Sequence, residues 1–410
     1  MTESADVVVI GAGAAGLMAA TRAGRVGAGR RRIVALDGSR KLGSKILIAG
    51  GGRCNVTHEV VDETAFAGSS AKAIRKVLGR FGVEDTIRFF GERGVEFKRE
   101  ETGKLFPTTD RARTVLDALL GAAREAGVEI RHPRRVETIR REGEGYVLAG
   151  DWGELAARRV VLATGGKSVP ETGSDGHGHE IARSLGHTIT RLLPALVPLL
   201  LPDGHYVRTL PGLTVPASFE VRSGSGKRLA AFTDSTLCTH FGLSGPSVLD
   251  VSRYLLDARL DDPGATLVAS WLPGESLESV DALLRDLGPK TPSGRLHERM
   301  PIRLARALCE AAGVDPALPG HQLSREARRT LARLVAADPL PIAGDRGFRV
   351  AEVTAGGVPL AEVRLETMES RVSPGLFLCG EVLDVDGRIG GYNFQWAWAS
   401  GHVAGTAAGT

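Results

Sequence analysis

The chain contains little cysteine. Its 410 residues include four cysteines, Cys54, Cys238, Cys309 and Cys379, which lie far apart and show no C-x-x-C or Cys/His spacing. Disulfide frameworks, structural zinc sites and dithiol redox centres all need closely spaced ligands or thiol pairs. We therefore expect reduced thiols, no bound metal, no dithiol chemistry at Cys54, and a cytoplasmic location.

A long hydrophobic run is also missing. The longest apolar stretch, residues 192–202, is interrupted by Pro194 and Pro198. It falls well short of the ~20 residues that a membrane helix needs. A strand-like sequence begins within the first ten residues, which leaves no room for a signal peptide. We expect neither a membrane partner nor secretion.

The charges nearly balance. The chain has 52 Lys and Arg against 48 Asp and Glu, a net charge of +4. Such a small surplus gives little reason to expect a nucleic-acid partner. The length suits two or three domains, and composition does not determine the oligomeric state.

The first motif that carries chemistry is at the N-terminus. Residues 7–10 predict a buried parallel strand, and a helix is predicted over 17–25. Between them lies a G-x-G-x-x-G pattern, whose glycines allow a tight turn and close approach of the backbone to a pyrophosphate at the helix N-terminus. The expected pyrophosphate-binding residues are Gly11, Gly13, Ala14, Ala15 and Gly16.

An acidic residue ends the next predicted strand. Residues 32–36 are apolar and lead into Asp37 and Gly38. An acid at this position binds the ribose hydroxyls of an adenosine, whereas an arginine would suit a 2′-phosphate. Asp37 therefore predicts an adenosine without a 2′-phosphate. An ordinary βαβ turn that binds no ligand is the alternative.

A second glycine-rich stretch covers residues 41–56. Three consecutive glycines are costly in chain entropy, and their N–H groups can cradle an anionic or flavin-like edge. A solvated loop, with Cys54 as a packing residue, is the alternative. The residues expected to line a cofactor here are Ser44, Lys45, Gly51, Gly52, Arg53, Cys54 and Asn55.

Later segments return to strand and glycine patterns. Strands are predicted over 135–139, 159–162, 348–354 and 375–379, and a helix opened by glycines follows near the C-terminus. Open α/β sheets bind ligands at the carboxyl ends of their strands, and a helix N-terminus can stabilise negative charge on a reduced flavin. The backbone near Val136 is expected to meet an adenine. The candidate residues are Val136, Thr164, Gly165, Gly166, Gly380, Glu381, Asp386, Gly390, Gly391, Tyr392 and Asn393.

The middle of the chain has another character. Residues 195–275 predict a β-rich inserted domain and 276–345 its helical part, while 1–194 and 346–410 complete the first domain. His240 either faces a substrate or belongs to a turn before a helix. A row of arginines, including Arg303, Arg306 and Arg329, is ordinarily a solvated basic face.

Taken together, these motifs resemble a known family, the BaiN/YhiN-type flavoproteins, described as NAD(P)/FAD-dependent or aminoacetone oxidase-like FAD-binding enzymes. The matching stretches include VVVIGAGAAGL, KLGSKILIAGGGRCNVT, THFGLSGP and GLFLCGEVLDVDGRIGGYNF. The resemblance implies an α/β fold: a Rossmann-like, glutathione-reductase-type FAD-binding domain with an inserted β-barrel-like plus helical domain. It also implies that the glycine and strand-end residues above hold FAD.

The sequence and the resemblance together predict an FAD-dependent oxidoreductase. Hydride passes from NAD(P)H through the flavin to a small organic acceptor such as a conjugated ketone or alkene. No second strand–GxGxxG–helix unit occurs, so NAD(P)H is a transient visitor. Tyr392 and His240 are the candidate general acids. The alternatives are an amine or aminoketone oxidase and, from another class, a flavin-bearing redox sensor or RNA-associated protein.

Overall fold

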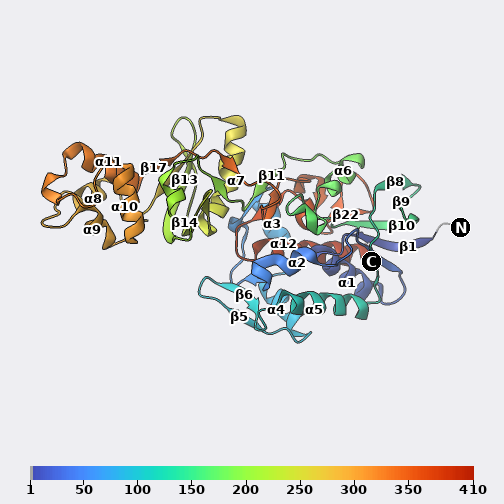
Figure 1. Cartoon of the computed structure of the whole chain (residues 1–410). Helices are drawn as coiled ribbons and strands as arrows, with labels where there is room; N and C mark the ends of the chain where they lie inside the picture. The colour runs from blue at the N-terminus through green and yellow to red at the C-terminus, as the bar shows by residue number, and fades with distance from the viewer. Residues whose placement is uncertain (1–2) are drawn as a thin grey trace. The chain divides into compact units, whose positions relative to one another are not determined.

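The computed structural model describes residues 3–410, and the chain divides into two compact units (Figure 1). Unit 1 joins both ends of the chain, because it runs to Pro194 and resumes with Glu352–Thr410. Unit 2 is the continuous segment Ala195–Ala351. Each unit encloses its own hydrophobic core, which is a defining property of a structural domain.

The central sheet of unit 1 is built around the N-terminal strand. Five parallel strands lie in the order β22, β10, β1, β2, β7, so chain order runs outward from β1 in both directions. Such a reversal makes the boundary between β1 and β10 the switch point where open α/β sheets bind ligands. The strands are β1 (Ser4–Ile10), β2 (Ile33–Leu36), β7 (Glu129–Arg131), β10 (Gly153–Leu162) and β22 (Leu376–Leu378).

The register of these strands brings their carboxyl ends level. Ile10 pairs with Leu36 on one side and Leu162 on the other, and Leu162 pairs with Leu378. The predicted buried strands at 7–10, 32–36 and 159–162 are confirmed. Antiparallel strands extend the sheet: β8 (Thr138–Glu142) and β9 (Gly145–Gly150) beside β10, and β20 (Val363–Arg364) and β21 (Glu369–Ser370) beside β22.

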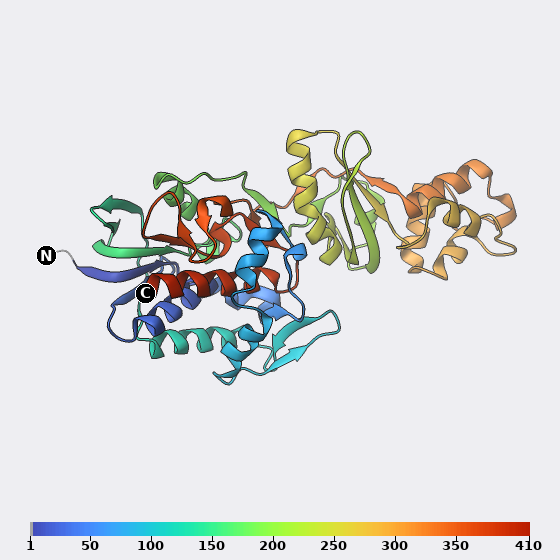
Figure 2. The ribbon, with the colours of Figure 1, turned by 180° about the vertical axis from the view of Figure 1, so that it is seen from behind.

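Two helices from opposite ends of the chain lie side by side, as Figures 1 and 2 both show: α1 (Ala14–Gly27) and α12 (Tyr392–Gly409). Gly401, Gly405 and Gly409 form a stripe on α12 that lets the two backbones approach. A Cβ at Gly405 would lie 2.1 Å from the carbonyl oxygen of Ala19. Any larger side chain would therefore separate the helices.

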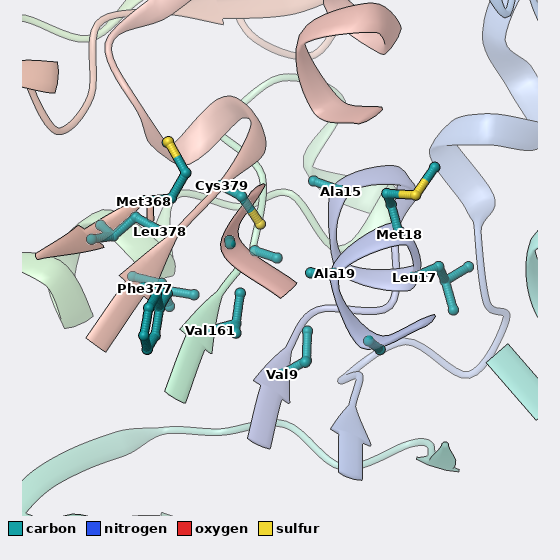
Figure 3. Close-up of a cluster of buried hydrophobic side chains, with 14 of the residues drawn as sticks. Val9, Ala15, Leu17, Met18, Ala19, Val161, Met368, Phe377, Leu378 and Cys379 are labelled. Carbon is teal, nitrogen blue, oxygen red and sulfur yellow. The ribbon is translucent and has the colours of Figure 1, made fainter. Parts of the chain in front are cut away.

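The core of unit 1 fills the space between α1 and the strands. Figure 3 shows Val9 and Val161 projecting from neighbouring strands toward Ala19 of α1. All three side chains are fully buried. The β-branched and small residues of the first motif therefore fix α1 directly against the sheet.

Shorter elements complete unit 1. The helices are α2 (Ser44–Ile48), α3 (Ala71–Leu78), α4 (Val83–Gly91), α5 (Ala112–Glu125) and α6 (His177–Ser184). Single 3-10 turns are η1 (Ala49–Gly52), η2 (Glu63–Ala65), η3 (Pro170–Thr172), η6 (Leu360–Glu362) and η7 (Gly380–Val382). Small sheets use β3 (Thr57–His58), β4 (Phe66–Gly68), β5 (Phe97–Arg99), β6 (Lys104–Pro107), β19 (Val353–Ala355) and β23 (Val385–Gly387), and β11 (Leu193–Ala195) spans the boundary with unit 2.

Unit 2 contains one antiparallel sheet and a set of helices. The sequence predicts a β-barrel-like insert. The observed sheet has the strand order β17, β16, β13, β14, β15, β12, β18. Its strands are β12 (Leu199–Leu200), β13 (Thr214–Arg222), β14 (Arg228–Thr239), β15 (Gly242–Ser244), β16 (Thr266–Ser270), β17 (Asp338–Leu340) and β18 (Gly344–Asp345). Its helices are α7 (Pro246–Asp261), α8 (Leu277–Leu283), α9 (Pro292–His297), α10 (Ile302–Ala311) and α11 (Arg325–Ala336), with turns η4 (Tyr206–Thr209) and η5 (Gly320–Gln322).

Two predicted strands are shorter than expected. Of residues 348–354 only the end is a strand, because the N–H groups of Val350 and Ala351 bond back to Gly347 in a local turn. Of residues 135–139 only the last two are in β8. The carbonyl of Arg135 accepts a bond from Trp152 Nε1 at 2.5 Å instead of from a strand partner.

Among residues 3–410, no helix combines the length and the apolar character that a membrane span requires.

Candidate functional site

The level strand ends of unit 1 gather the predicted glycines at one edge of the sheet. Gly11 follows β1, Thr164 lies two residues beyond β10, and Gly380 two residues beyond β22. Backbone bonds continue the ladder past the strands, since Gly11 N donates to Leu36 O at 2.8 Å. The sheet therefore brings segments from both ends of the chain to a single edge.

Close backbone approaches explain three of these glycines. A Cβ at Gly16 would lie 1.8 Å from the carbonyl oxygen of Gly11, and a Cβ at Gly11 would lie 2.5 Å from that of Ala163. A Cβ at Gly380 would lie 2.7 Å from the Cβ of Ala15. The N-terminal turn, the end of β10 and the end of β22 are thus packed together with no room for side chains.

No close contact with a described protein atom requires a glycine at position 13. Its φ is −84°, which any residue adopts, and a Cβ there would meet no protein atom within 4 Å. It precedes α1, whose N-terminus has no side-chain cap and no acid in its first turn. Unpaired N–H groups at a helix N-terminus attract an anion. The open space at Gly13 therefore fits a phosphate group lying against the backbone.

Asp37 is held by backbone donors. Its two carboxylate oxygens accept bonds from Ala12 N and Ser39 N, each at 2.7 Å. Arg134 N donates to the Asp37 carbonyl at 2.6 Å, and a Cβ at Gly38 would touch the Arg135 side chain at 3.1 Å. The structure thus brings the predicted ribose and adenine segments, 37–38 and 134–136, next to each other.

The glycine run adopts a conformation that other residues resist. Gly50, Gly51 and Gly52 have φ values of 57°, 68° and 85°. Successive left-handed residues are accessible almost only to glycine, so the run is a structural requirement of this loop. Cys54 follows with φ 61° and is fully buried. Burial raises the pKa of its thiol, which disfavours the thiolate and agrees with a packing role for Cys54.

An ion pair joins two segments more than three hundred residues apart in sequence. Lys45 Nζ lies 2.7 Å from Glu381 Oε2 and 2.6 Å from Ser168 Oγ. Glu381 Oε1 accepts from Ser168 Oγ at 3.0 Å and from Thr354 N at 2.7 Å. Three segments therefore converge on the carboxylate of a fourth, and we call this group the Lys45–Glu381 node.

The node is possible only because Gly166 lacks a side chain. A Cβ there would lie 2.4 Å from Thr354 Oγ1 and 2.8 Å from Glu381 Oε1. Burial by itself would raise the pKa of Glu381, but the charge of Lys45 and the hydrogen bonds outweigh it and hold that pKa below its ordinary value. Glu381 is therefore a carboxylate at neutral pH.

Other residues of the glycine loop use their polar groups within the chain. Arg53 Nη1 pairs with Glu100 at 2.7 Å, and its guanidinium stacks 4.1 Å from the ring of Phe106. Ser44 Oγ donates to Lys41 O at 2.8 Å. The charges of Lys45 and Arg53 are thus both compensated by carboxylates.

The start of α12 is pressed against the glycine loop. Gly391 has φ 97°, and a Cβ there would lie 2.6 Å from the carbonyl carbon of Thr57 and 2.9 Å from Asn55 Oδ1. The Asn393 amide bonds both the N–H and the carbonyl of Gly387 at 2.8 Å. The structure therefore brings residues 55–57 and 390–393 together.

Aromatic contacts hold the side chain of Tyr392. Its ring stacks on His58 with centroids 5.0 Å apart and meets the edge of Phe66 at 6.1 Å. A Cβ at Gly390 would lie 3.4 Å from the Tyr392 ring. Asp386 is buried in β23, which pairs with β4. Tyr392, Gly390 and Asp386 thus all belong to the C-terminal side of the candidate site.

Buried oxygen atoms of Thr164 and Asn55 have no partner among the described residues. Within the described residues, Thr164 Oγ1 and Asn55 Oδ1 form no hydrogen bond. Thr164 follows β10 at the sheet edge, and Asn55 follows the glycine run. Buried polar atoms are normally satisfied, so an unpaired one calls for a bound molecule or water. These atoms and the space at Gly13 fit a polar cofactor such as FAD.

His240 lies in unit 2, in the turn between β14 and β15. Its ring is exposed and contacts Phe241, with centroids 5.1 Å apart. Its carbonyl accepts a bond from Arg208 Nε at 2.8 Å. The segment 236–246 is therefore mostly a hairpin, with its turn at His240, which precedes α7.

Sequence reasoning missed three polar residues of the site. Ser168 and Thr354 complete the Lys45–Glu381 node, and both are fully buried. His179 is buried, and this burial lowers its pKa. Ser168 lies two residues beyond the Gly165–Gly166 pair, and this short distance in sequence could have indicated that it belongs to the site.

Comparisons with known proteins agree with this architecture. A 3-dehydro-bile acid delta(4,6)-reductase of Clostridium scindens is 35% identical over 404 residues, 98% of both chains. A ribosomal RNA dihydrouridine synthase of Escherichia coli is 33% identical over 403 residues, 97% of this chain and 96% of the relative. The structure of 3-ketosteroid delta1-dehydrogenase from Sterolibacterium denitrificans matches with a TM-score of 0.51 at 14% identity, covering all of both chains.

The similarity to this solved structure concerns the fold alone. The predicted Rossmann-type FAD-binding fold is confirmed, and it contains several sheets. The sequence profile described as the HI0933-like protein Rossmann domain matches residues 5–407. With this match and the full-length relatives, the predicted BaiN/YhiN-type membership is confirmed. This chain belongs to the HI0933-like Rossmann-domain family.

Proposed function

We propose that this enzyme, an FAD-dependent oxidoreductase, reduces a carbon–carbon double bond conjugated with a carbonyl group, using NAD(P)H as the donor. The observation that carries the proposal is full-length similarity to two relatives whose names describe this chemistry on different molecules. A delta(4,6)-reductase of a 3-dehydro bile acid and a synthase of dihydrouridine both add hydrogen across such a bond. The common element is the bond, not the molecule around it.

The chain's own residues supply the binding site. The N–H groups at Gly13–Gly16 bind the pyrophosphate of FAD, Asp37 binds its ribose, and the backbone near Val136 its adenine. The unpaired oxygens of Thr164 and Asn55 bind toward the flavin end. The Lys45–Glu381 node positions the glycine loop against the strand ends, so that the loop stays ordered beside the cofactor.

FAD, when bound, supplies the hydride-transfer chemistry. The net reaction adds a hydride from NAD(P)H and a proton to the two carbons of the double bond. Electrons therefore balance without another reductant. A side chain that gives the proton must reach the carbon next to the carbonyl. Tyr392 and His240 are the candidates, and Tyr392 belongs to the same unit as the glycine turns.

Anaerobic stopped-flow measurements test this reaction. Holoenzyme is mixed with NADH or NADPH, bleaching of the flavin is followed, and the reduced enzyme is then mixed with a 4,6-dien-3-one steroid, with a uridine-containing RNA, or with oxygen. We expect fast reoxidation by one of the first two and slow reoxidation by oxygen. Fast reoxidation by oxygen alone would support the amine or aminoketone oxidase alternative and overturn the proposal.

The general acid is tested separately with Tyr392→Phe. This variant keeps the ring that stacks on His58 and removes only the hydroxyl. We expect flavin reduction to be unchanged and reoxidation by the acceptor to slow by about 10²-fold or more, the usual contribution of a general acid. Unchanged reoxidation would exclude Tyr392 and leave His240, which is tested with His240→Gln.

A uridine base in RNA is the second candidate substrate. It is favoured by a specific feature of unit 2: exposed arginines on α10 and α11 that form no ion pair with any carboxylate of residues 3–410.

A further inference from the structure

Helix α11 carries an unpaired stripe of positive charge. Arg325, Arg329 and Arg333 are exposed and recur every fourth residue, so they follow one face of the helix. Within residues 3–410, none of the three forms an ion pair or a side-chain hydrogen bond. Arg328, on the same helix, pairs with Asp281 at 2.9 Å. The three residues are called the arginine stripe below.

The stripe does not serve the stability of its own helix. Like charges four residues apart repel each other and weaken a helix. Arg325 is moreover the first residue after the Ser324 cap, at the positive end of the helix dipole. Glu326 is the one acid of α11, and it is exposed. Only Arg333, in the last turn, occupies a place that the dipole favours.

Neighbouring cations in unit 2 behave differently. Arg285, Arg295 and Arg299 pair with carboxylates at 2.6–2.9 Å. On α10 and α11, which contact one another, exposed arginines form no ion pair within the described part of the chain. The charge of Arg333 opposes the rise in pKa that burial causes at Asp338. The charge of the stripe is therefore available to an external anion.

We propose that the arginine stripe binds the phosphate backbone of RNA. This inference rests on the proposed function, in its form with a uridine base as substrate. Guanidinium groups bind phosphate in bidentate geometry, and a row of evenly spaced guanidiniums matches a chain of phosphates rather than a single anion. Phosphate contacts position a nucleic acid without reading its sequence. The stripe would thus hold an RNA substrate without selecting its sequence.

Salt-dependent binding tests the proposal. The probe is a fluorescein-labelled RNA hairpin with unpaired uridines, titrated with holoenzyme between about 50 and 200 mM salt, a range over which phosphate contacts weaken strongly. The variant is R325Q/R329Q/R333Q. We expect its affinity to fall at every salt concentration and the slope of log K against log salt to become shallower by about 2 to 3, the value for three lost phosphate contacts.

Two matched variants separate the stripe from general charge. R325K/R329K/R333K keeps the charges, so its salt slope should remain near that of the wild type. K72Q/R113Q/R124Q removes three exposed cations from helices of unit 1 and should leave the slope nearly unchanged. Thermal unfolding and the rate of flavin reduction by NAD(P)H should be the same in all four proteins, which shows that folding and the cofactor site are intact.

Several results would overturn the inference. They are an unchanged salt slope in R325Q/R329Q/R333Q, an equal loss in K72Q/R113Q/R124Q, no RNA binding by the wild type at about 50 mM salt, or binding to phosphatidylglycerol vesicles but not to RNA. Failure of the proposed function looks different. RNA binding would then depend on the stripe as expected, while no conjugated acceptor reoxidises the reduced flavin.

Discussion

Helices α1 and α12 both begin after a glycine in unit 1, yet the two N-termini are built for different purposes. Before α1, Gly13 has ordinary backbone angles and open space where a side chain would be. Before α12, Gly391 has φ 97° and is pressed against Thr57 and Asn55. Neither helix has a side-chain cap or an acid in its first turn.

The contrast shows that glycine can precede a helix for two different structural reasons. Gly391 is required by the fold, because it joins the C-terminal helix to the glycine loop. Gly13 is not required by any contact among the described residues, which agrees with the proposed phosphate site. The same local sequence pattern therefore marks a joint in one place and a proposed ligand site in the other. Substitutions can separate the two.

Gly391→Ala should have the largest effect on stability. It adds a Cβ 2.6 Å from the Thr57 carbonyl carbon and forces a side chain into a left-handed conformation. Left-handed backbone alone costs about 1–2 kcal/mol per residue, and the backbone clash should raise the loss to about 3 kcal/mol or more. Urea unfolding of the apoprotein measures this. A loss below about 1 kcal/mol would show that the joint is looser than the structure indicates.

Glu381→Gln should have the next largest effect. Gln keeps an acceptor for Ser168 and Thr354 but removes the charge opposite Lys45, so we expect a loss of about 2 kcal/mol. Because the folded pKa of Glu381 is lowered, its contribution is present at neutral pH and disappears as pH falls through that pKa. The unfolding free energies of the wild type and the variant should therefore become similar at acidic pH.

The control for Glu381 is Glu129→Gln. Glu129 pairs with Arg32 at 3.0 Å, but its side chain is 45% exposed. Exposed pairs contribute little, so we expect a change within about 0.5 kcal/mol. Equal losses in the two variants would mean that the Lys45–Glu381 node is an ordinary surface ion pair.

His402 on α12 should give a pH-dependent effect of similar size. Burial, with the charge of Arg22, lowers its pKa from 6.5 to about 4, and its ring packs on Phe81 at 4.6 Å. Between these pH values the unfolded chain binds a proton that the folded protein does not. Stability should therefore fall by about 2 kcal/mol as pH drops across that interval. His402→Phe should flatten the curve, and His321→Phe, at an exposed histidine, is the comparison.

Gly13→Ala should have the smallest effect on stability and a large one on the cofactor. With no protein atom within 4 Å, the new methyl group should change the unfolding free energy of the apoprotein by less than about 0.5 kcal/mol. The same methyl group occupies the phosphate space, so FAD affinity measured by flavin fluorescence should fall at least about tenfold. Unchanged affinity would remove the phosphate site from α1. Gly16→Ala, 1.8 Å from Gly11 O, should impair both properties.

Much of unit 1 could be predicted from the sequence. Apolar β-branched runs at 7–10, 32–36 and 159–162 gave the strands, and the glycines after them gave the turns, because buried strands and left-handed turns leave local composition signals. The prediction over 348–354 was too long because a local turn at Gly347 competes with pairing. Cys54 as a packing residue also agrees with its full burial.

The small net charge of the chain did not reveal the arginine stripe. A total of +4 gave little reason to expect a nucleic acid, since 52 Lys and Arg are nearly balanced by 48 Asp and Glu. The arginines of α11 were visible as a row, but a row of arginines is usually a solvated face. Which of them have partners depends on where Asp281 lies in the fold. Sequence could not supply that information.

The sequence by itself determined the family, the strand ends and the glycine turns, because these depend on residues close together in the chain. Only the tertiary structure decided which distant groups meet: Lys45 with Glu381, Gly391 with Thr57, and Gly405 with Ala19. Such contacts follow from strand order and register across the sheet. Neither leaves a local pattern, so the packing of the two chain ends had to be seen before any residue could be given a place in the site.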